Sequence, residues 1–252
     1  MRVAVTRPEP QASRTAQRLI AAGHTPILAP LLVFRPLPAG PIDAASFDAL
    51  AITSRSAVAA LAALAGSEPD QAGMEALRTL PVFAVGEATA DAARATGFAH
   101  VTSANGDAAA LAALLAERLA PGARILHLAG ADQAADLGAL LRPHGLAVEV
   151  RIMYRMEAAG ALPAPLVEAA ARAEVDAVLV YSPRTAAVYA DCLAASAAQP
   201  ALVRVPHLAL SERVAAPLRK AGIGEILVSP RLHEDAILTL VEDSLKGRAA
   251  ER

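Results

Sequence analysis

The sequence predicts an α/β fold, with two doubly wound parallel-sheet domains joined by a two-stranded antiparallel β-ribbon that acts as a hinge. Three observations predict it. Short continuous apolar runs alternate with Ala- and Leu-rich amphipathic stretches, and several of these stretches end at a glycine. Continuous apolar runs are typical of parallel strands that helices cover on both faces. Two extended segments interrupt the alternation.

Each expected strand is followed by an expected helix. In order, the pairs are Val3–Thr6 with Ala12–Ala22, Ala49–Thr53 with Ala57–Ala65, Val82–Val85 with Ala88–Thr96, His100–Ser103 with Ala108–Leu119, Ile125–Ala129 with Ala134–Leu141, Ala177–Tyr181 with Ala186–Ala195, Leu208–Ser211 with Val214–Ala221, and Glu225–Ser229 with Asp235–Leu245. Glycines 23, 97, 145 and 222 follow helical stretches, where a left-handed cap is expected.

The two interrupting segments predict the ribbon. In Val148–Arg155 apolar and charged residues alternate, which is typical of a half-exposed strand rather than of a core parallel strand. Leu31–Leu37, followed by a Pro/Gly-rich stretch, is the other extended candidate. If the two pair, a discontinuous first domain comprises 1–34 and 156–252, a second domain 40–147, and the ribbon linker 35–39 and 148–155.

The composition excludes several classes of function. The formal charge is −2, with 23 Lys+Arg against 25 Asp+Glu, and only 3% of residues are aromatic, so neither nucleic acid nor an anionic membrane is an expected partner. Cys192 is the only cysteine, which excludes an intramolecular disulfide and suits a reducing cytoplasm. No apolar run reaches the length of a membrane span. Nucleotide-binding and metal-site motifs are missing from the sequence, so we expect no cofactor and no metal.

Ligands of open α/β sheets bind at the carboxyl ends of the strands, and hydroxyls and arginines recur in those loops. The arginines are Arg7, Arg55, Arg184, Arg213 and Arg231. Because a cation at a helix N-terminus meets the positive end of the helix dipole, their repetition favours a cleft for carboxylates or phosphates. The alternative is a set of surface arginines that pair with neighbours such as Glu9 or Glu212.

The polar residues in these loops have structural interpretations as well. Ser54, Ser182 and Ser211 are placed to cap helices, as are Asp107 and Asp132, and Glu87 suits a first helical turn. His127 lies inside an apolar run and is expected to be a packed core imidazole. Tyr154 lies on the predicted ribbon, where its hydroxyl would either donate to a developing charge or pack the ribbon onto one domain.

Several segments together indicate a family. They are, in order, VAVTRPEPQ (3–11), FDALAITSRSAV (47–58), LPVFAVGEATADAARATGF (80–98), GDAAALAALL (106–115), RILHLAGAD (124–132), VRIMYRMEA (150–158), AVLVYSPRTA (177–186) and LALSERVAAPL (208–218). Their order over nearly the whole chain resembles uroporphyrinogen-III synthase. The resemblance implies two α/β domains on a two-stranded ribbon and a cofactor-independent, cyclising hydro-lyase of tetrapyrrole biosynthesis (haem, sirohaem and cobalamin).

The resemblance also implies the chemistry and its residues. Hydroxymethylbilane would lose water and close, with ring D inverted, to uroporphyrinogen III. Tyr154 and Thr89 match the family's cleft residues and are the expected catalytic pair. The expected substrate-binding residues are Arg7, Thr53, Ser54, Arg55, Gly86, Gly130, Ser182, Arg184, Ser211 and Arg213.

One loop departs from the family pattern. Where animal relatives have a Gly-Pro-Thr-Thr type loop, this chain has Ser211-Glu212-Arg213-Val214, so Arg213 is expected to replace the missing hydroxyls as a carboxylate binder. We expect a cytoplasmic monomer that receives its substrate by a transient hand-over from the upstream bilane-forming deaminase. The alternative function is a non-catalytic, hinged two-domain binder of an anionic metabolite.

Overall fold

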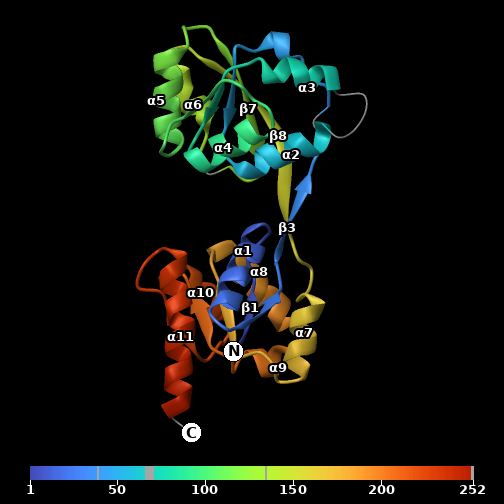
Figure 1. The fold of residues 1–252 in the computed structure, drawn as a ribbon, viewed down its shortest axis with the longest axis vertical. Coiled ribbons are helices and arrows are strands. Elements are labelled where there is room, and N and C mark those ends of the chain that lie inside the picture. The colour runs from blue at the N-terminus through green and yellow to red at the C-terminus, as the bar shows by residue number, and fades with distance from the viewer. Residues whose placement is uncertain (39, 66–70, 134, 251–252) are drawn as a thin grey trace. The chain divides into compact units, whose positions relative to one another are not determined.

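The computed structural model describes residues 1–38, 40–65, 71–133 and 135–250 (Figure 1). The chain divides into two compact units. Unit 1 comprises Met1–Val33 and Glu157–Arg252, and unit 2 comprises Phe34–Met156. The helices of each unit lie against that unit's own sheet.

Unit 1 contains a parallel five-stranded sheet, in the order β11-β10-β9-β1-β2. Its strands are β1 (Arg2–Val5), β2 (Thr25–Leu28), β9 (Ala177–Val180), β10 (His207–Ala209) and β11 (Ile226–Val228). Its helices are α1 (Gln11–Ala21), α7 (Ala164–Ala171), α8 (Pro183–Ala194), α9 (Gln199–Leu202), α10 (Glu212–Lys220) and α11 (Glu234–Ala250). Alternating side chains of β1 point to opposite faces, because Val3 and Val5 pack with α1 and α11, whereas Ala4 packs with α7 to α10.

Unit 2 contains a six-stranded sheet, in the order β3-β8-β7-β4-β5-β6. Its strands are β3 (Leu32–Pro36), β4 (Ala49–Ile52), β5 (Val82–Ala84), β6 (Val101–Ser103), β7 (Arg124–Gly130) and β8 (Ala147–Ala158). Its helices are α2 (Arg55–Ala65), α3 (Gln71–Arg78), α4 (Glu87–Ala95), α5 (Ala108–Arg118) and α6 (Leu137–Leu141), with short 3-10 turns η1 (Ala44–Ser46) and η2 (Arg142–His144).

The two faces of this second sheet have separate cores. Leu50 and Ile52 of β4 pack with α2, α3 and α4, whereas Ala49 and Ala51 pack with α5 and α6. In both units, parallel strands are therefore covered by helices on both faces, with β3 added at the edge of the second sheet, and the predicted α/β fold class is confirmed.

The predicted glycine caps are also confirmed. Gly23, Gly97, Gly145 and Gly222 all have positive φ, between 70° and 94°, which is the left-handed conformation that glycine adopts without a steric penalty.

Two strand predictions need correction. β2 was not expected, because Pro26 and Pro30 break its pattern, and it is tolerated as the last strand of its sheet. The expectation that Val148–Arg155 is not a parallel strand was wrong, since Ala147 to Tyr154 pair in parallel with β7. On its other side β8 lies beside β3, the second extended segment, and the Leu37 amide donates to the Met153 carbonyl at 2.8 Å. The alternation of apolar and charged residues in Val148–Arg155 correctly indicated a partly exposed strand. A parallel strand near the edge of a sheet has the same alternation, so the pattern could not exclude parallel pairing.

One helix also begins later than predicted. α6 begins at Leu137, and its cap is Asp136 rather than Asp132, because the Asp136 carboxylate accepts a hydrogen bond from the Ala139 amide at 2.9 Å. The predicted start at residue 134 and the linker position 39 lie outside the described residues.

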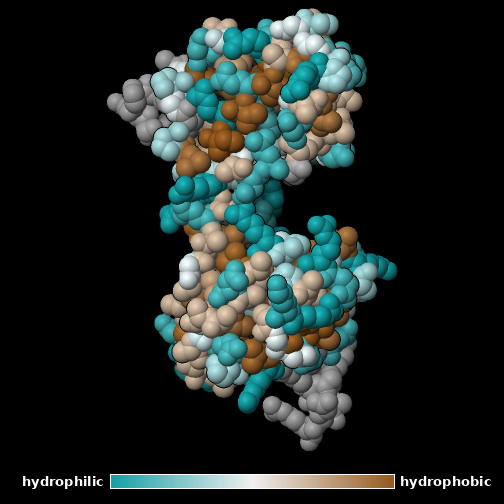
Figure 2. All heavy atoms as spheres, turned by 180° about the vertical axis from the view of Figure 1, so that it is seen from behind, coloured by the Kyte–Doolittle hydropathy of each residue, from teal (hydrophilic) through white to brown (hydrophobic). Residues whose placement is uncertain are grey.

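The surface of each unit mixes apolar and polar side chains. On the face shown in Figure 2, hydrophobic and hydrophilic side chains are interspersed over each unit, as is usual for protein surfaces. Within the described ranges, no helix is both long enough and apolar enough to cross a membrane.

Candidate functional site

The carboxyl end of β4 in unit 2 presents two consecutive hydroxyls, Thr53 and Ser54. The alternation of side chains along β4 sends neighbouring residues to opposite faces of the sheet. Accordingly, the Thr53 hydroxyl lies 3.1 Å from Nε2 of His127, on β7, whereas the Ser54 hydroxyl accepts a hydrogen bond from Tyr154, on β8. Both side chains are half-buried.

Tyr154 is held against this strand end from two sides. Its hydroxyl donates to Ser54 Oγ at 3.0 Å, and its ring lies 5.4 Å from the Phe34 ring, centroid to centroid. Gly130 ends β7 beside it, at an irregularity in the β7–β8 register. A Cβ at Gly130 would come within 2.6 Å of the tyrosine Cζ, so only glycine allows this close approach.

His127 lies behind this edge and is almost fully buried, with 2% of its surface exposed. Burial lowers the pKa of His127 to about 4, and the charge of Asp136 opposes the shift. The imidazole is therefore neutral near pH 7. The prediction of a packed core histidine is confirmed for its burial, but its hydrogen bond to Thr53 connects it to the strand end.

Other predicted residues of unit 2 lie on neighbouring loops. Gly86 is the N-cap of α4, and its carbonyl accepts a hydrogen bond from the Thr89 amide at 3.0 Å. Thr89 is buried, with 6% exposure, on the first turn of the helix. Arg55 begins α2. Unit 2 thus brings Ser54, Gly130 and Tyr154 into one cluster, while Thr53 pairs with His127 on the other face of the sheet.

In unit 1, Arg7 follows β1 and is engaged with an acid from the far end of the chain. Its guanidinium contacts the Glu234 carboxylate at 3.1 Å and lies over the Tyr181 ring, 4.2 Å from the centroid. Thr15 donates to the same carboxylate. Burial raises the pKa of Tyr181 to about 12, and the charge of Glu234 adds to the shift while Arg7 opposes it.

The pairing of Arg7 differs from the alternative that the sequence offered. Glu9 accepts hydrogen bonds from Ser13, and Glu212 pairs with Arg219 at 2.6 Å, so neither neighbour neutralises a loop arginine. Tyr181 and Glu234 were not expected at this edge. Tyr181 ends an apolar run and carried a weak signal, whereas no local pattern could indicate Glu234.

The remaining predicted residues of unit 1 surround the starts of α8 and α10. Ser182 caps α8, because its Oγ accepts from the Thr185 amide at 3.0 Å, whereas Ser211 precedes α10 without a side-chain cap. Arg184 and Arg213 are exposed in the first turns of these helices.

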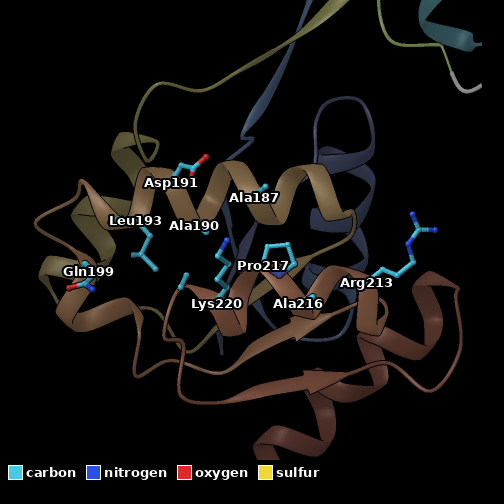
Figure 3. A pocket seen from close by; sticks show the side chains of 11 residues that line it. Ala187, Ala190, Asp191, Leu193, Gln199, Arg213, Ala216, Pro217 and Lys220 are labelled. Atoms are coloured by element: carbon cyan, nitrogen blue, oxygen red, sulfur yellow. The ribbon is translucent and has the colours of Figure 1, made fainter.

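A groove of about 640 Å³ runs between α8 and α10 (Figure 3). Its walls are mainly alanine, leucine and proline, and Arg213 is the predicted binding residue that lines it. In Figure 3 the guanidinium of Arg213 extends away from Pro217 and Lys220. The groove therefore does not collect the predicted residues of unit 1.

The two strand-end edges differ in chemistry. The edge of unit 2 offers hydroxyl groups whose nearest side-chain partners are neutral, which suits hydrogen bonding to carboxylates and proton donation to a departing oxygen. The edge of unit 1 offers a guanidinium already matched by a carboxylate. Among the described residues no group of three or more His, Cys, Asp or Glu side chains is placed to hold a metal ion.

Comparison with known proteins gives the family. A model of uroporphyrinogen-III synthase HemD matches residues 13–239. The chain belongs to the uroporphyrinogen-III synthase family. This family comprises cyclising lyases of porphyrin and haem biosynthesis, so the match confirms the family and the activity that the sequence predicted.

Solved structures of family members share the fold. The uroporphyrinogen-III synthetase of Helicobacter pylori is 17% identical, with a TM-score of 0.63 over 96% of this chain and 99% of that one. A mutant uroporphyrinogen III synthase of the extremely thermophilic bacterium Thermus thermophilus is 21% identical, with a TM-score of 0.54 over 98% and 99%. No curated protein sequence gave a significant match.

Proposed function

We propose that this chain converts hydroxymethylbilane to uroporphyrinogen III and that Tyr154 is its proton donor. The observation that carries the assignment of roles is the cluster at the β4 end, where the phenol of Tyr154 donates to the hydroxyl of Ser54, next to Thr53, in a chain of this family. The phenol is half-buried and donates to a neutral hydroxyl, so its proton is available for a leaving oxygen.

In the proposed reaction, the phenol donates a proton to the hydroxymethyl oxygen of ring A, which leaves as water. The bond that breaks is the C–O bond, and the ring nitrogen supplies the electron pair that forms an azafulvenium ion. The Ser54 hydroxyl then stabilises the phenolate. The substituted carbon of ring D attacks the cation to give a spiro-pyrrolenine, which fragments and recloses in the inverted sense, and the proton finally lost restores the phenol.

The protein's main task in this proposal is positioning. The substrate is reactive by itself, and unassisted closure gives the type I isomer, so the substrate must be held folded. Arg55, Arg184 and Arg213, with the hydroxyls at the strand ends, would bind its acetate and propionate groups through charge-assisted hydrogen bonds. Arg7 would join them by exchanging the Glu234 carboxylate for one of the substrate. Gly86, which is open on its Cβ side, would admit the substrate close to the backbone, Gly130 would act by allowing the Tyr154 ring its place beside the substrate, and Thr89 would bind a carboxylate or the leaving oxygen.

The decisive experiment is an isomer assay. The purified protein is supplied with freshly generated hydroxymethylbilane, and the products are separated by chromatography after oxidation to porphyrins. We expect the type III isomer to dominate. A product that is only type I would refute the synthase activity and would favour a non-catalytic binder of an anionic metabolite.

We propose further that the two units act as separate domains that bind one substrate together. Each has its own sheet and its own cores, which supports independent folding. We also propose a monomer in the cytoplasm that receives the bilane by transient hand-over from the deaminase that makes it. The free thiol of Cys192 supports a reducing compartment.

A further inference from the structure

Three features of His127 connect it to the candidate site. It is almost entirely removed from solvent, since 2% of its surface is exposed. Its Nε2 lies 3.1 Å from the hydroxyl of Thr53, a half-buried residue at the strand end. Its Nδ1 is buried and has no hydrogen-bond partner among the residues that the structure describes. One ring nitrogen therefore faces the candidate site, and the other faces the core.

The unpartnered nitrogen determines which nitrogen carries the proton. Neutral imidazole has one N–H donor and one lone-pair acceptor. A proton on Nδ1 would leave a buried N–H without an acceptor, which is rare and costly in folded proteins. A proton on Nε2 leaves only a lone pair unmatched and gives the Thr53 oxygen a donor. The arrangement therefore favours the Nε2–H tautomer.

We propose that His127 is a positioning residue, whose Nε2–H donates to Thr53 Oγ1 and so directs the threonine's own proton outward, to donate to a carboxylate of the substrate. A threonine hydroxyl without such a partner turns readily toward nearby backbone carbonyls. With its acceptor lone pair occupied by the histidine, the hydroxyl works as a fixed donor. The inference rests on the proposed function and deepens it.

The electrostatic surroundings keep this arrangement fixed near neutral pH. The charged group that acts on His127 is Asp136, which caps α6 on the same face of the sheet. Desolvation outweighs its attraction and lowers the histidine pKa to about 4. The ring therefore holds a single proton under assay conditions. A cationic imidazole would instead place a proton on the nitrogen that has no partner.

The first test reads the tautomer without any substrate. We expect the 15N spectrum of the histidine-labelled full chain at pH 7 to show His127 protonated at Nε2 and unprotonated at Nδ1. In the Thr53→Val variant, which removes the hydroxyl, the Nε2 chemical shift of His127 should change. His127→Leu assigns the signal. A ring protonated at Nδ1, or an Nε2 shift that does not respond to Thr53→Val, would overturn the inference.

The second test separates positioning from packing. His127→Leu removes the donor, and His127→Gln places an amide N–H at a similar reach. We expect His127→Leu to raise KM for the bilane about threefold to tenfold, the effect of losing one hydrogen bond, and to change kcat by less than about twofold. His127→Gln should return KM most of the way to the wild-type value. Equal losses in both variants, or unchanged KM in His127→Leu, would overturn it.

A double-mutant cycle completes the test. Because His127 acts through Thr53 in this inference, adding His127→Leu to Thr53→Val should raise KM no further, whereas independent effects would multiply and refute the coupling. The wild-type isomer assay is run alongside. If the wild type forms no type III isomer, the proposed function fails, and the tautomer measurement alone decides the hydrogen bond.

Discussion

Each unit buries a histidine within its sheet, and the two provide a comparison of two regions of the molecule. His207 is on β10 of unit 1, with 0% of its surface exposed, and His127 is on β7 of unit 2, with 2% exposed. Burial lowers the pKa of both to about 4. Neither the burial nor the pKa distinguishes them.

Their partners do distinguish them. His207 donates from Nδ1 to the Val205 carbonyl at 2.7 Å, and its Nε2 accepts from the hydroxyl of Tyr189, itself fully buried, at 2.8 Å. Both nitrogens are thus satisfied inside the core. His127 has one partner, the half-buried Thr53, and one unmatched nitrogen. The difference indicates that His207 stabilises its unit, whereas His127 serves the strand end.

The largest effect that we predict is on stability. His207→Leu leaves the buried Tyr189 hydroxyl and the half-buried Val205 carbonyl without their histidine partner and should lower the free energy of unfolding by about 3 kcal/mol. His127→Leu replaces an incompletely bonded ring by an apolar side chain and should change stability by less than about 1 kcal/mol. Urea unfolding followed by circular dichroism measures both, and equal losses would remove the distinction between the two histidines.

The dependence of stability on pH should be shared by the two regions. Each folded-state pKa is about 4, below the ordinary value of 6.5, so the unfolded chain binds protons first as pH falls below 6.5. Stability contributed by keeping each ring neutral is therefore fully present above pH 6.5 and is lost as pH falls toward 4.

We expect each histidine to account for about 2 kcal/mol of the stability lost between pH 7 and pH 5. His127→Leu should abolish its share of this loss while leaving stability at pH 7 nearly intact. The measurement is urea unfolding of wild type and variant at both pH values. An identical pH dependence in the two proteins would show that His127 titrates normally in the folded state.

The comparison also shows what the sequence could and could not predict. Parallel strands and glycine caps follow from local patterns, so the fold class and the positions of Gly23 and Gly97 were predictable. β2 was missed because its prolines resemble a loop, and only its place at the sheet edge permits them. The loops at the strand ends were predictable as a set, because parallel strands bring their carboxyl ends to one edge.

The partners within those loops were not predictable. Thr53 and His127 are 74 positions apart and meet because β4 and β7 pair with Ala51 opposite His127. Arg7 and Glu234 are 227 positions apart, and nothing in the residues around either one indicates the other. The register of the strands and the contacts between residues far apart in sequence are set by the packing of the whole sheet. Residue types in the loops can therefore indicate where a site lies, but they cannot show which side chains hydrogen-bond there.

The next prediction concerns the space beside Tyr154. Gly130→Ala adds a Cβ that would lie 2.6 Å from Cζ and 2.8 Å from the hydroxyl oxygen of the tyrosine, so the ring must move. We expect a loss of stability of about 1–2 kcal/mol together with a fall in kcat. Gly160→Ala in unit 1 is the matched control, because its Cβ would meet no atom within 4 Å. A fully active Gly130→Ala would show that the position of the ring is unimportant.

The smallest effect in free energy is the most informative about function, and it compares two tyrosines. Tyr154→Phe removes the proposed proton donor and leaves Ser54 at a half-buried position where water replaces the lost bond. We expect kcat to fall about tenfold, at the low end for a general acid because the substrate is intrinsically reactive, with stability nearly unchanged.

Tyr189→Phe is the matched variant in unit 1. It leaves Nε2 of His207 without its donor inside the core and should cost about 1–2 kcal/mol of stability while kcat stays at the wild-type value. Steady-state kinetics and urea unfolding of both variants give opposite patterns if the proposal holds. Wild-type turnover in Tyr154→Phe would make this tyrosine a packing residue, and the strand-end cluster of unit 2 would then act by binding alone.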